Sequence, residues 1–124
     1  MLRILLSVLL VVHGIAHLVG FLVPWRLVEM PEMPYSTTIL AGQVDLGDTG
    51  IRVYGILWLL GGVAFLLAAW GGWTRHRWWA ELVVGAALLS LILSVLGWPD
   101  SRIGVWVNLA LLAGLFVWRP FEWL

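Results

Sequence analysis

Residues 4–23 read ILLSVLLVVHGIAHLVGFLV, twenty consecutive residues without a charged side chain. A helix of this length rises about 30 Å, which is the thickness of the hydrocarbon core of a bilayer. A cleaved signal peptide is the alternative, with Arg3 as its positive region and Gly14-Ile15-Ala16 as a small-residue cleavage site. The apolar run continues without a break past Ala16, which favours a transmembrane helix.

Three further apolar runs follow in the chain. They are residues 53–73, 82–98 and 103–118. The links at 74–81 and 99–102 are short, so the helices that they join lie antiparallel. The connection 24–52 is long and proline-rich, and its part 37–44 reads either as a short strand or as an interfacial segment. The sequence predicts an all-α integral membrane four-helix bundle of up-down topology, a single domain over residues 1–124 with one long extracytoplasmic loop between helices 1 and 2.

The composition supports a membrane protein and excludes several other classes. Hydrophobic residues make up 62% of the 124 residues, charged residues 11%, and the mean hydropathy is +1.00. A soluble domain is about half apolar and a quarter charged. This composition excludes a disordered chain, a nucleic-acid-binding protein and an ordinary cytosolic enzyme. The formal net charge is zero, which predicts no strong electrostatic preference for a partner. Cysteine and lysine are absent, so disulfides, thiolate metal sites, cysteine nucleophiles and lysine Schiff bases are excluded.

The arginines predict the orientation of the bundle. One side of the membrane, which holds both chain ends and the 74–81 link, carries Arg3, Arg75, Arg77 and Arg119. On the other side, Arg26, Arg52 and Arg102 stand among five acidic residues. Cytoplasmic loops carry an excess of basic residues, so we expect both termini in the cytoplasm.

Most of the ten tryptophans mark the ends of the predicted helices. Those at outer ends are Trp25 and Trp98, and those at inner ends are Trp70, Trp73, Trp78, Trp79, Trp118 and Trp123. Such positions are typical of the aromatic belt at a membrane interface. Trp58 and Trp106 lie within the predicted spans, where they serve either as packing or as a stacking wall for a planar ligand.

Small residues recur every four positions on three of the helices. They are Ala64, Ala68 and Gly72, then Ala86, Ser90 and Ser94, then Ala110 and Gly114. Small residues let helix backbones approach closely in lipid. The stripes therefore predict a tight bundle or a homodimer.

Polar side chains gather in the outer half of every predicted span. His13 and His17 are four residues apart and share one helix face. Ionisable groups inside a membrane are costly and usually mark a partner or a function. We therefore expect an intramembrane cup that opens outward, floored by His13. Its expected wall residues are His17, Arg52, Tyr54, Ser90, Ser94 and Asn108.

Structural roles are the alternative for several of these residues. Asp48 or Thr49 is expected to cap the second helix, and Asp100 or Ser101 the fourth. Arg52 can pair with a loop carboxylate or reach lipid phosphate. The two serines can bond to their own helix backbone. His76, between two arginines, is expected to face solvent or lipid.

The histidine pair admits two kinds of chemistry. Two histidines at i and i+4 can share a metal ion, but no glutamate of a zinc-protease helix accompanies them, and a haem would need His76 from the wrong membrane face. Proton transfer to a quinone, isoprenoid or lipid-like ligand is the other possibility. In that site His13 and His17 relay protons and Arg52 and Asn108 hold the polar head. The supporting residues are Asp48 and Asp100, which orient Arg52 and Arg102, and the pocket walls Trp58 and Trp106.

The sequence leaves the cofactor, and whether the protein is an enzyme, open. A structural function is the second hypothesis. A small tight bundle is also typical of an accessory subunit of a larger transporter or respiratory complex, in which the polar layer locks the helices together. A haem- or metal-binding membrane protein is the third.

Three strings carry a resemblance to a family. They are HGIAHLVGF (13–21), MPYSTTILAGQVDLGDTGIRVYGILWLL (33–60) and GWPDSRIGVWVNL (97–109). The chain resembles a group of small bacterial four-span membrane proteins that often carry the label transport permease, and more distantly the DoxX-type membrane proteins in architecture. The resemblance implies the four-span fold and a bacterial inner-membrane location, and it supplies no catalytic residue.

Overall fold

The computed structural model describes residues 2–118, which form four helices and one short β-hairpin. The elements are α1 (Leu2–Leu22), β1 (Thr38–Ile39), β2 (Val44–Asp45), α2 (Gly47–Trp73), α3 (Trp79–Leu96) and α4 (Arg102–Trp118). The first three helices are long and apolar enough to cross a membrane, and α4 is an apolar helix of 17 residues. The predicted membrane four-helix bundle is confirmed. The expectations for Arg119 and Trp123 fall outside the described residues.

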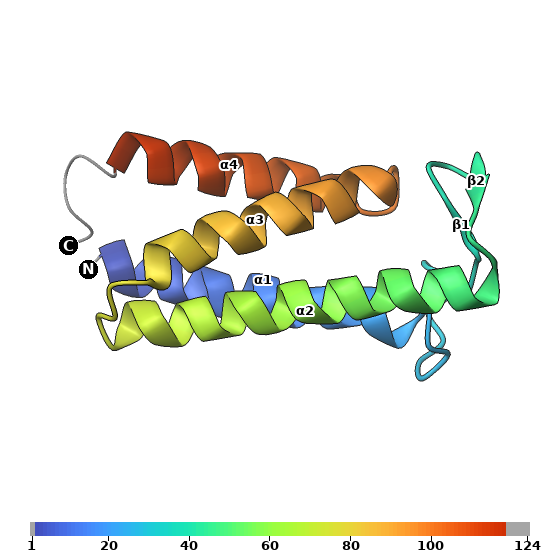
Figure 1. Ribbon diagram of the computed structural model, residues 1–124, viewed down its shortest axis with the longest axis horizontal. Helices are drawn as coiled ribbons and strands as arrows, with labels where there is room; N and C mark the ends of the chain where they lie inside the picture. Colours follow the sequence, from blue (N-terminus) through green and yellow to red (C-terminus); the bar gives the residue numbers. More distant parts are fainter. Residues whose placement is uncertain (1, 119–124) are drawn as a thin grey trace.

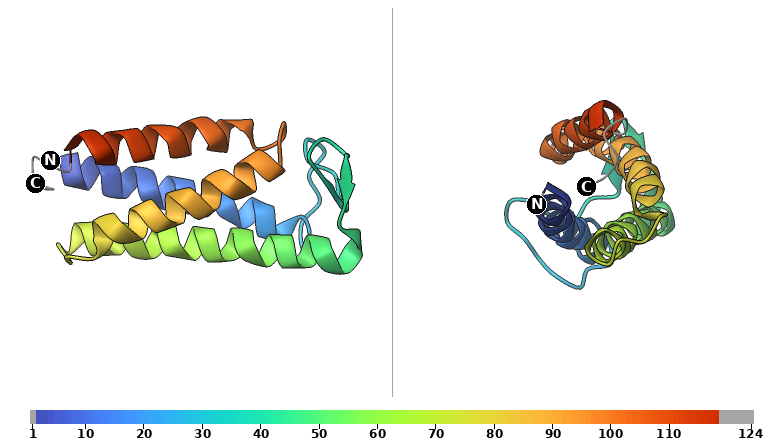
Figure 2. Two further views of the ribbon diagram at one scale, coloured as in Figure 1. Left: turned by 45° about the horizontal axis from the view of Figure 1, so that its top comes forward. Right: turned by 90° about the vertical axis from the view of Figure 1, so that its left-hand side faces the viewer.

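The helices run up and down, with two different ends (Figure 1). The start of α1, the α2–α3 link and the end of α4 lie at one end, called here the terminal end. The long loop with its hairpin and the α3–α4 turn form the other, called the loop end. Each helix packs against its neighbour in the chain, whereas α1 and α4 make few close contacts. Seen along its axis, the bundle is therefore an arc that is open between α1 and α4 (Figure 2).

The loop end contains a β-hairpin, which the periodicity of the sequence did not determine. The segment 37–44, left open between strand and interfacial segment, contributes to an antiparallel hairpin in which Thr38 pairs with Asp45. The Asp45 carboxylate accepts hydrogen bonds from the Gly47 backbone N–H (2.9 Å) and the Thr37 hydroxyl (2.7 Å). Both hydrogen bonds stabilise the charged carboxylate and hold the pKa of Asp45 below its ordinary value of 3.8. The bond from the Gly47 N–H has the larger effect and the bond from the Thr37 hydroxyl the smaller one. Helix α2 begins directly after this turn, six residues before the predicted span.

The expected cap of α2 is wrong. Leu46 occupies the N-cap position and makes no side-chain cap hydrogen bond, while Asp48 and Thr49 lie inside the helix. The carboxylate of Asp48 instead accepts a hydrogen bond from the Tyr35 hydroxyl (2.5 Å), and it lies 3.8 Å from the Arg26 guanidinium. Asp48 thus fastens the loop to the first turn of α2, where its negative charge also suits the helix dipole.

Two hydrogen bonds fasten the loop end to α3. The backbone N–H of Leu40, at the tip of the hairpin, donates to the Leu96 carbonyl (2.7 Å). The Ser101 hydroxyl, an expected cap of α4, donates to the Ser94 carbonyl (2.7 Å). These bonds hold the hairpin and the α3–α4 turn beside each other.

The packed core occupies the terminal half of the bundle. It is a cluster of buried side chains from all four helices: Leu10, Phe65, Ala68, Ala69, Trp79, Val83, Ala86, Ala87, Leu111 and Leu115. At the terminal end, the Arg3 guanidinium donates to the carbonyls of Gly72 (2.5 Å) and Trp73 (3.0 Å). These carbonyls lie in the last turn of α2 and lack partners within the helix, so Arg3 completes that helix end.

The small-residue stripes serve the packing of the chain's own helices. Ala68 and Gly72 on α2, and Ala86 with both serines on α3, are buried as expected. The stripe on α4 is wrong at Ala110, which is exposed. Helix α4 packs closely only against α3, so it needs only one buried face.

Helices α1 and α2 approach each other closely at a pair of glycines. A Cβ added to Gly62 would lie 2.9 Å from the Gly14 carbonyl oxygen, and one added to Gly14 would lie 3.0 Å from the Gly62 oxygen. The two backbones are therefore in direct contact, which only glycine at both positions permits.

His76 does not simply face solvent or lipid. It is half-buried at the terminal end, where its ring stacks on Trp70 (centroids 4.7 Å apart) and lies 5.2 Å from Trp78. The Thr74 hydroxyl lies 2.6 Å from its Nδ1. His76 is thus part of the aromatic cluster that closes the α2–α3 link.

Candidate functional site

Four buried polar side chains form a hydrogen-bonded ring at the middle of the bundle, called here the polar ring: His13, His17, Ser90 and Asn108. Nε2 of His13 lies 3.1 Å from Oδ1 of Asn108, whose Nδ2 donates to Oγ of Ser90 (2.7 Å). That Oγ lies 2.5 Å from Nε2 of His17. Nδ1 of His17 returns to the His13 carbonyl oxygen at 2.7 Å.

The positions of these residues in the helices explain the ring. His13 and His17 lie one turn apart on α1 and face the bundle interior, as their spacing predicts. Ser90 comes from α3 and Asn108 from α4, each from the half of its helix nearer the loop end. The ring therefore connects α1 to α4, two helices that otherwise make few close contacts.

Aromatic rings from α2 hold the two imidazoles in place. The Phe65 ring centroid lies 4.7 Å from that of His13 and 5.0 Å from that of His17. The Trp58 ring lies 5.0 Å from His17 on the loop side. The polar ring thus separates the apolar core from the loop half of the bundle.

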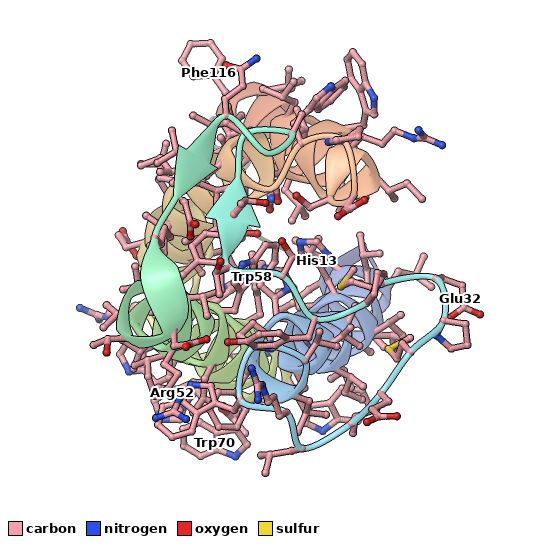
Figure 3. All side chains as sticks on the ribbon, turned by 90° about the vertical axis from the view of Figure 1, so that its right-hand side faces the viewer. His13, Glu32, Arg52, Trp58, Trp70 and Phe116 are labelled. Carbon is pink, nitrogen blue, oxygen red and sulfur yellow. The ribbon has the colours of Figure 1, made fainter. Side chains whose placement is uncertain are left out.

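A cavity of about 610 Å³ fills the loop half, from His13 to the hairpin. Helices α1, α2 and α4, the long loop and the α3–α4 turn all contribute to its wall. Figure 3 looks along the bundle from the loop end, and both His13 and Trp58 lie in the space between the helices. The volume is in the range of small-molecule binding sites.

Five of the predicted site residues line this cavity. They are His13, His17 and Tyr54 of the expected cup, the expected wall residue Trp58, and Asp100. Ser90 and Asn108 are fully buried and reach the cavity only through the histidines to which they are bonded. The Tyr54 hydroxyl donates to the Leu93 carbonyl (2.7 Å), so its main contact joins α2 to α3.

The other predicted residues do not reach the cavity wall. Arg52 is exposed, and its guanidinium lies 5.8 Å from the Trp25 ring, outside the bundle (Figure 3). Arg102 is exposed as well, and Trp106 is 64% exposed on the outward face of α4. Asp48 binds Tyr35 and Arg26 rather than Arg52. Neither arginine is therefore placed to hold a ligand head group.

Ser94 is a separate case. Its hydroxyl is sealed from solvent, and among the described residues it is the one buried side-chain oxygen or nitrogen without a hydrogen-bond partner. The backbone of Gly104 lies against it, because a Cβ at position 104 would come within 2.5 Å of Oγ. Ser94 thus lets α4 approach α3 closely and takes no part in the polar ring.

The long loop contributes a wall of the cavity that the sequence did not predict. Ser36 and Thr38 from the loop, and Ser101 from the turn, line the cavity. The hydrogen bond between Leu40 and Leu96, residues 56 apart in the chain, fastens the hairpin to α3. No periodicity or motif signals such a contact, so sequence reasoning had no means of finding it.

The ring geometry also bears on the metal hypothesis. Both nitrogens of His17 are engaged, so the two histidines are not arranged to share an ion. Within residues 2–118, no three histidine or acidic side chains come together as a metal site would require. Comparison of the chain with protein-family models, curated proteins and solved structures gave no match. The site is therefore interpreted from its own geometry.

Proposed function

We propose that this protein binds a lipophilic or amphipathic small molecule in the cavity above the polar ring. The observation that carries the proposal is the cavity itself. It is about 610 Å³ in volume, mostly apolar in its wall, and ends at the imidazole of a buried histidine. Concave apolar sites with a few convergent polar groups are typical of ligand binding. Quinone-like, isoprenoid and lipid-like molecules all belong to the proposed class.

The role of the two histidines differs in this proposal. His17 has no free ring nitrogen and positions the polar ring, while His13 is the residue that meets the ligand. Transfer of a proton between the ligand and His13 is part of the proposed function.

The proposed location is a bacterial inner membrane, with the terminal end in the cytoplasm and the loop end outside. Two features support it. The resemblance to small bacterial four-span proteins concerns the same strings that form the loop end and the polar ring. The paired Arg75 and Arg77 at the terminal end follow the positive-inside rule.

Native mass spectrometry of protein extracted from membranes in mild detergent tests the proposal. We expect a bound small molecule on the wild-type protein and its loss from the Ala16→Phe variant, because Ala16 lines the cavity and a benzyl group there fills part of it. Ala110→Phe is the matched control, since Ala110 is exposed on α4 and away from the cavity wall. Equal occupancy in the two variants, or a bare wild-type protein, would contradict the proposal.

A further inference from the structure

The backbone carbonyl oxygen of His13 determines the direction of every hydrogen bond in the polar ring. A backbone carbonyl oxygen only accepts, so Nδ1 of His17 carries the proton that goes to the His13 carbonyl. A neutral His17 then accepts at Nε2, and the Ser90 hydroxyl must donate to it. The Ser90 oxygen in turn accepts from Asn108, whose remaining amide atom is its oxygen. Nε2 of His13 must therefore donate to that oxygen.

The remaining nitrogen of His13 is thereby defined as well. Charged side chains are costly at this depth, because His13 lies nine residues before the end of α1, about 13 Å along the helix. A neutral His13 with its proton on Nε2 has a lone pair on Nδ1. Within residues 2–118, no hydrogen-bond partner of this Nδ1 is found, and it is not among the sealed unpaired atoms. It is therefore an unpaired acceptor that is not sealed, on a residue that lines the cavity.

The rest of the cavity wall disfavours an anionic ligand. Among the described residues that line it, Asp100 is the one acid, and no arginine is present. Arg52 and Arg102 are exposed elsewhere. A carboxylate or phosphate head group would meet a lone pair at the floor and a carboxylate at the mouth.

We infer that the ligand carries an uncharged hydroxyl group, which donates its hydrogen bond to Nδ1 of His13. The inference rests on the function proposed above and names the class of its ligand as apolar alcohols or phenols. An ether, ester or quinone carbonyl offers only acceptors and leaves Nδ1 unpaired. Unpaired polar groups in a buried site are the strongest source of discrimination between such analogues.

Photolabelling with three matched probes tests the inference. The probes are a dodecanol with a diazirine in its chain, the corresponding methyl ether and the corresponding fatty acid. The protein is held in lipid nanodiscs, and labelled peptides of the cavity wall are quantified by mass spectrometry. We expect the alcohol to label the cavity about fivefold more than the ether, the value of one buried hydrogen bond, and the fatty acid least.

The variant His13→Phe removes the acceptor. A phenyl ring fills the space of the imidazole and has neither Nδ1 nor Nε2, so the donor to Asn108 is lost as well. We expect alcohol labelling to fall to the ether level in this variant while ether labelling stays unchanged. Unchanged ether labelling also shows that the variant is folded. If the variant does not fold, the comparison of the three probes on the wild-type protein still tests the inference.

The outcomes separate the two proposals. Equal labelling by alcohol and ether in the wild-type cavity would overturn the hydroxyl inference and leave the binding function standing. Preferential labelling by the fatty acid would also overturn it, because His13 would then be a charged donor. If no probe labels the cavity more in the wild type than in Ala16→Phe, the proposed function itself is wrong.

Discussion

Ser90 and Ser94 show how differently two similar residues can be used. Both are fully buried, both lie on α3, and they are separated by a single helical turn. Ser90 donates to one side chain of the polar ring and accepts from another, whereas the Ser94 hydroxyl has no partner within the described chain. The sequence predicted the same role for both. The packing of the neighbouring helices distinguishes them, because it brings His17 of α1 and Asn108 of α4 to Ser90 but Gly104 of α4 to Ser94.

The first prediction compares alanine at these two positions. Ser90→Ala leaves Nε2 of His17 and Nδ2 of Asn108 each without a partner, so we expect the free energy of unfolding to fall by about 1–3 kcal/mol. Ser94→Ala removes an unpaired hydroxyl, and we expect a change within about 0.5 kcal/mol. Unfolding in increasing SDS, followed by tryptophan fluorescence, measures both. Equal losses in the two variants would mean that the polar ring contributes nothing specific.

The second prediction concerns Asp45, which lies outside the membrane. Its pKa is lowered in the folded loop, so the stability that it contributes is present above the unfolded pKa and is lost as the pH falls through the folded value. We expect the Gly47 amide resonance to titrate with a midpoint below 3.8, and Thr37→Val to raise that midpoint. An NMR titration of the protein in detergent measures it. An unchanged midpoint in Thr37→Val would show that the Thr37 hydroxyl does not contribute to the lowered pKa of Asp45.

At the scale of the helix, most of the architecture was accessible from the sequence. An uncharged apolar run of about 20 residues is typical of a transmembrane helix. A short link between two such helices makes them pack antiparallel. The helix ends were less predictable. Helix α2 begins at Gly47 because a carboxylate two residues earlier binds its first N–H, and the exposed Asp48 and Arg52 then continue the helix beyond the apolar run.

The third prediction tests the contact between α1 and α2. Gly62→Ala places a methyl group 2.9 Å from the Gly14 carbonyl oxygen, so we expect the helices to separate and the free energy of unfolding to fall by about 1–3 kcal/mol. Gly85→Ala is the matched control. No atom lies within 4 Å of a Cβ at that position, and the gain in helix propensity is about 0.5–1 kcal/mol.

The same SDS unfolding experiment compares the two glycine variants. Opposite signs for Gly62→Ala and Gly85→Ala are the expected result. A loss of stability at both positions would show that replacing any glycine in these helices is destabilising, and that the contact between α1 and α2 is not the cause.

At the scale of the whole molecule, the sequence indicated that one half of the bundle is apolar and the other half polar. The structure shows three layers along the bundle axis. The apolar core, the polar ring and the cavity follow one another from the terminal end to the loop end. The clustering of polar residues in the outer half of each helix predicted this order. The composition of the cavity wall was not predictable, because Arg52 and Trp106 turn outward on their helices and the loop fills the space instead.

The fourth prediction concerns the orientation of the molecule. The chain has no cysteine, so single cysteines introduced at exposed positions are labelled without background. We expect Gln43→Cys at the loop end to react with a membrane-impermeant maleimide on intact cells, and Glu81→Cys at the terminal end to react only after the membrane is opened. The reverse pattern would show that the cavity opens to the cytoplasm.

Helix α2 is longer than the apolar run that it contains. It has 27 residues and rises about 40 Å, of which residues 53–73 account for about 31 Å. The hydrocarbon core of a bilayer is about 30 Å thick, so the first turns of α2, with the exposed Asp48 and Arg52, extend into the headgroup region. The hairpin stands at the same level as these turns. We therefore expect a ligand to meet the protein among the lipid headgroups and not in open water.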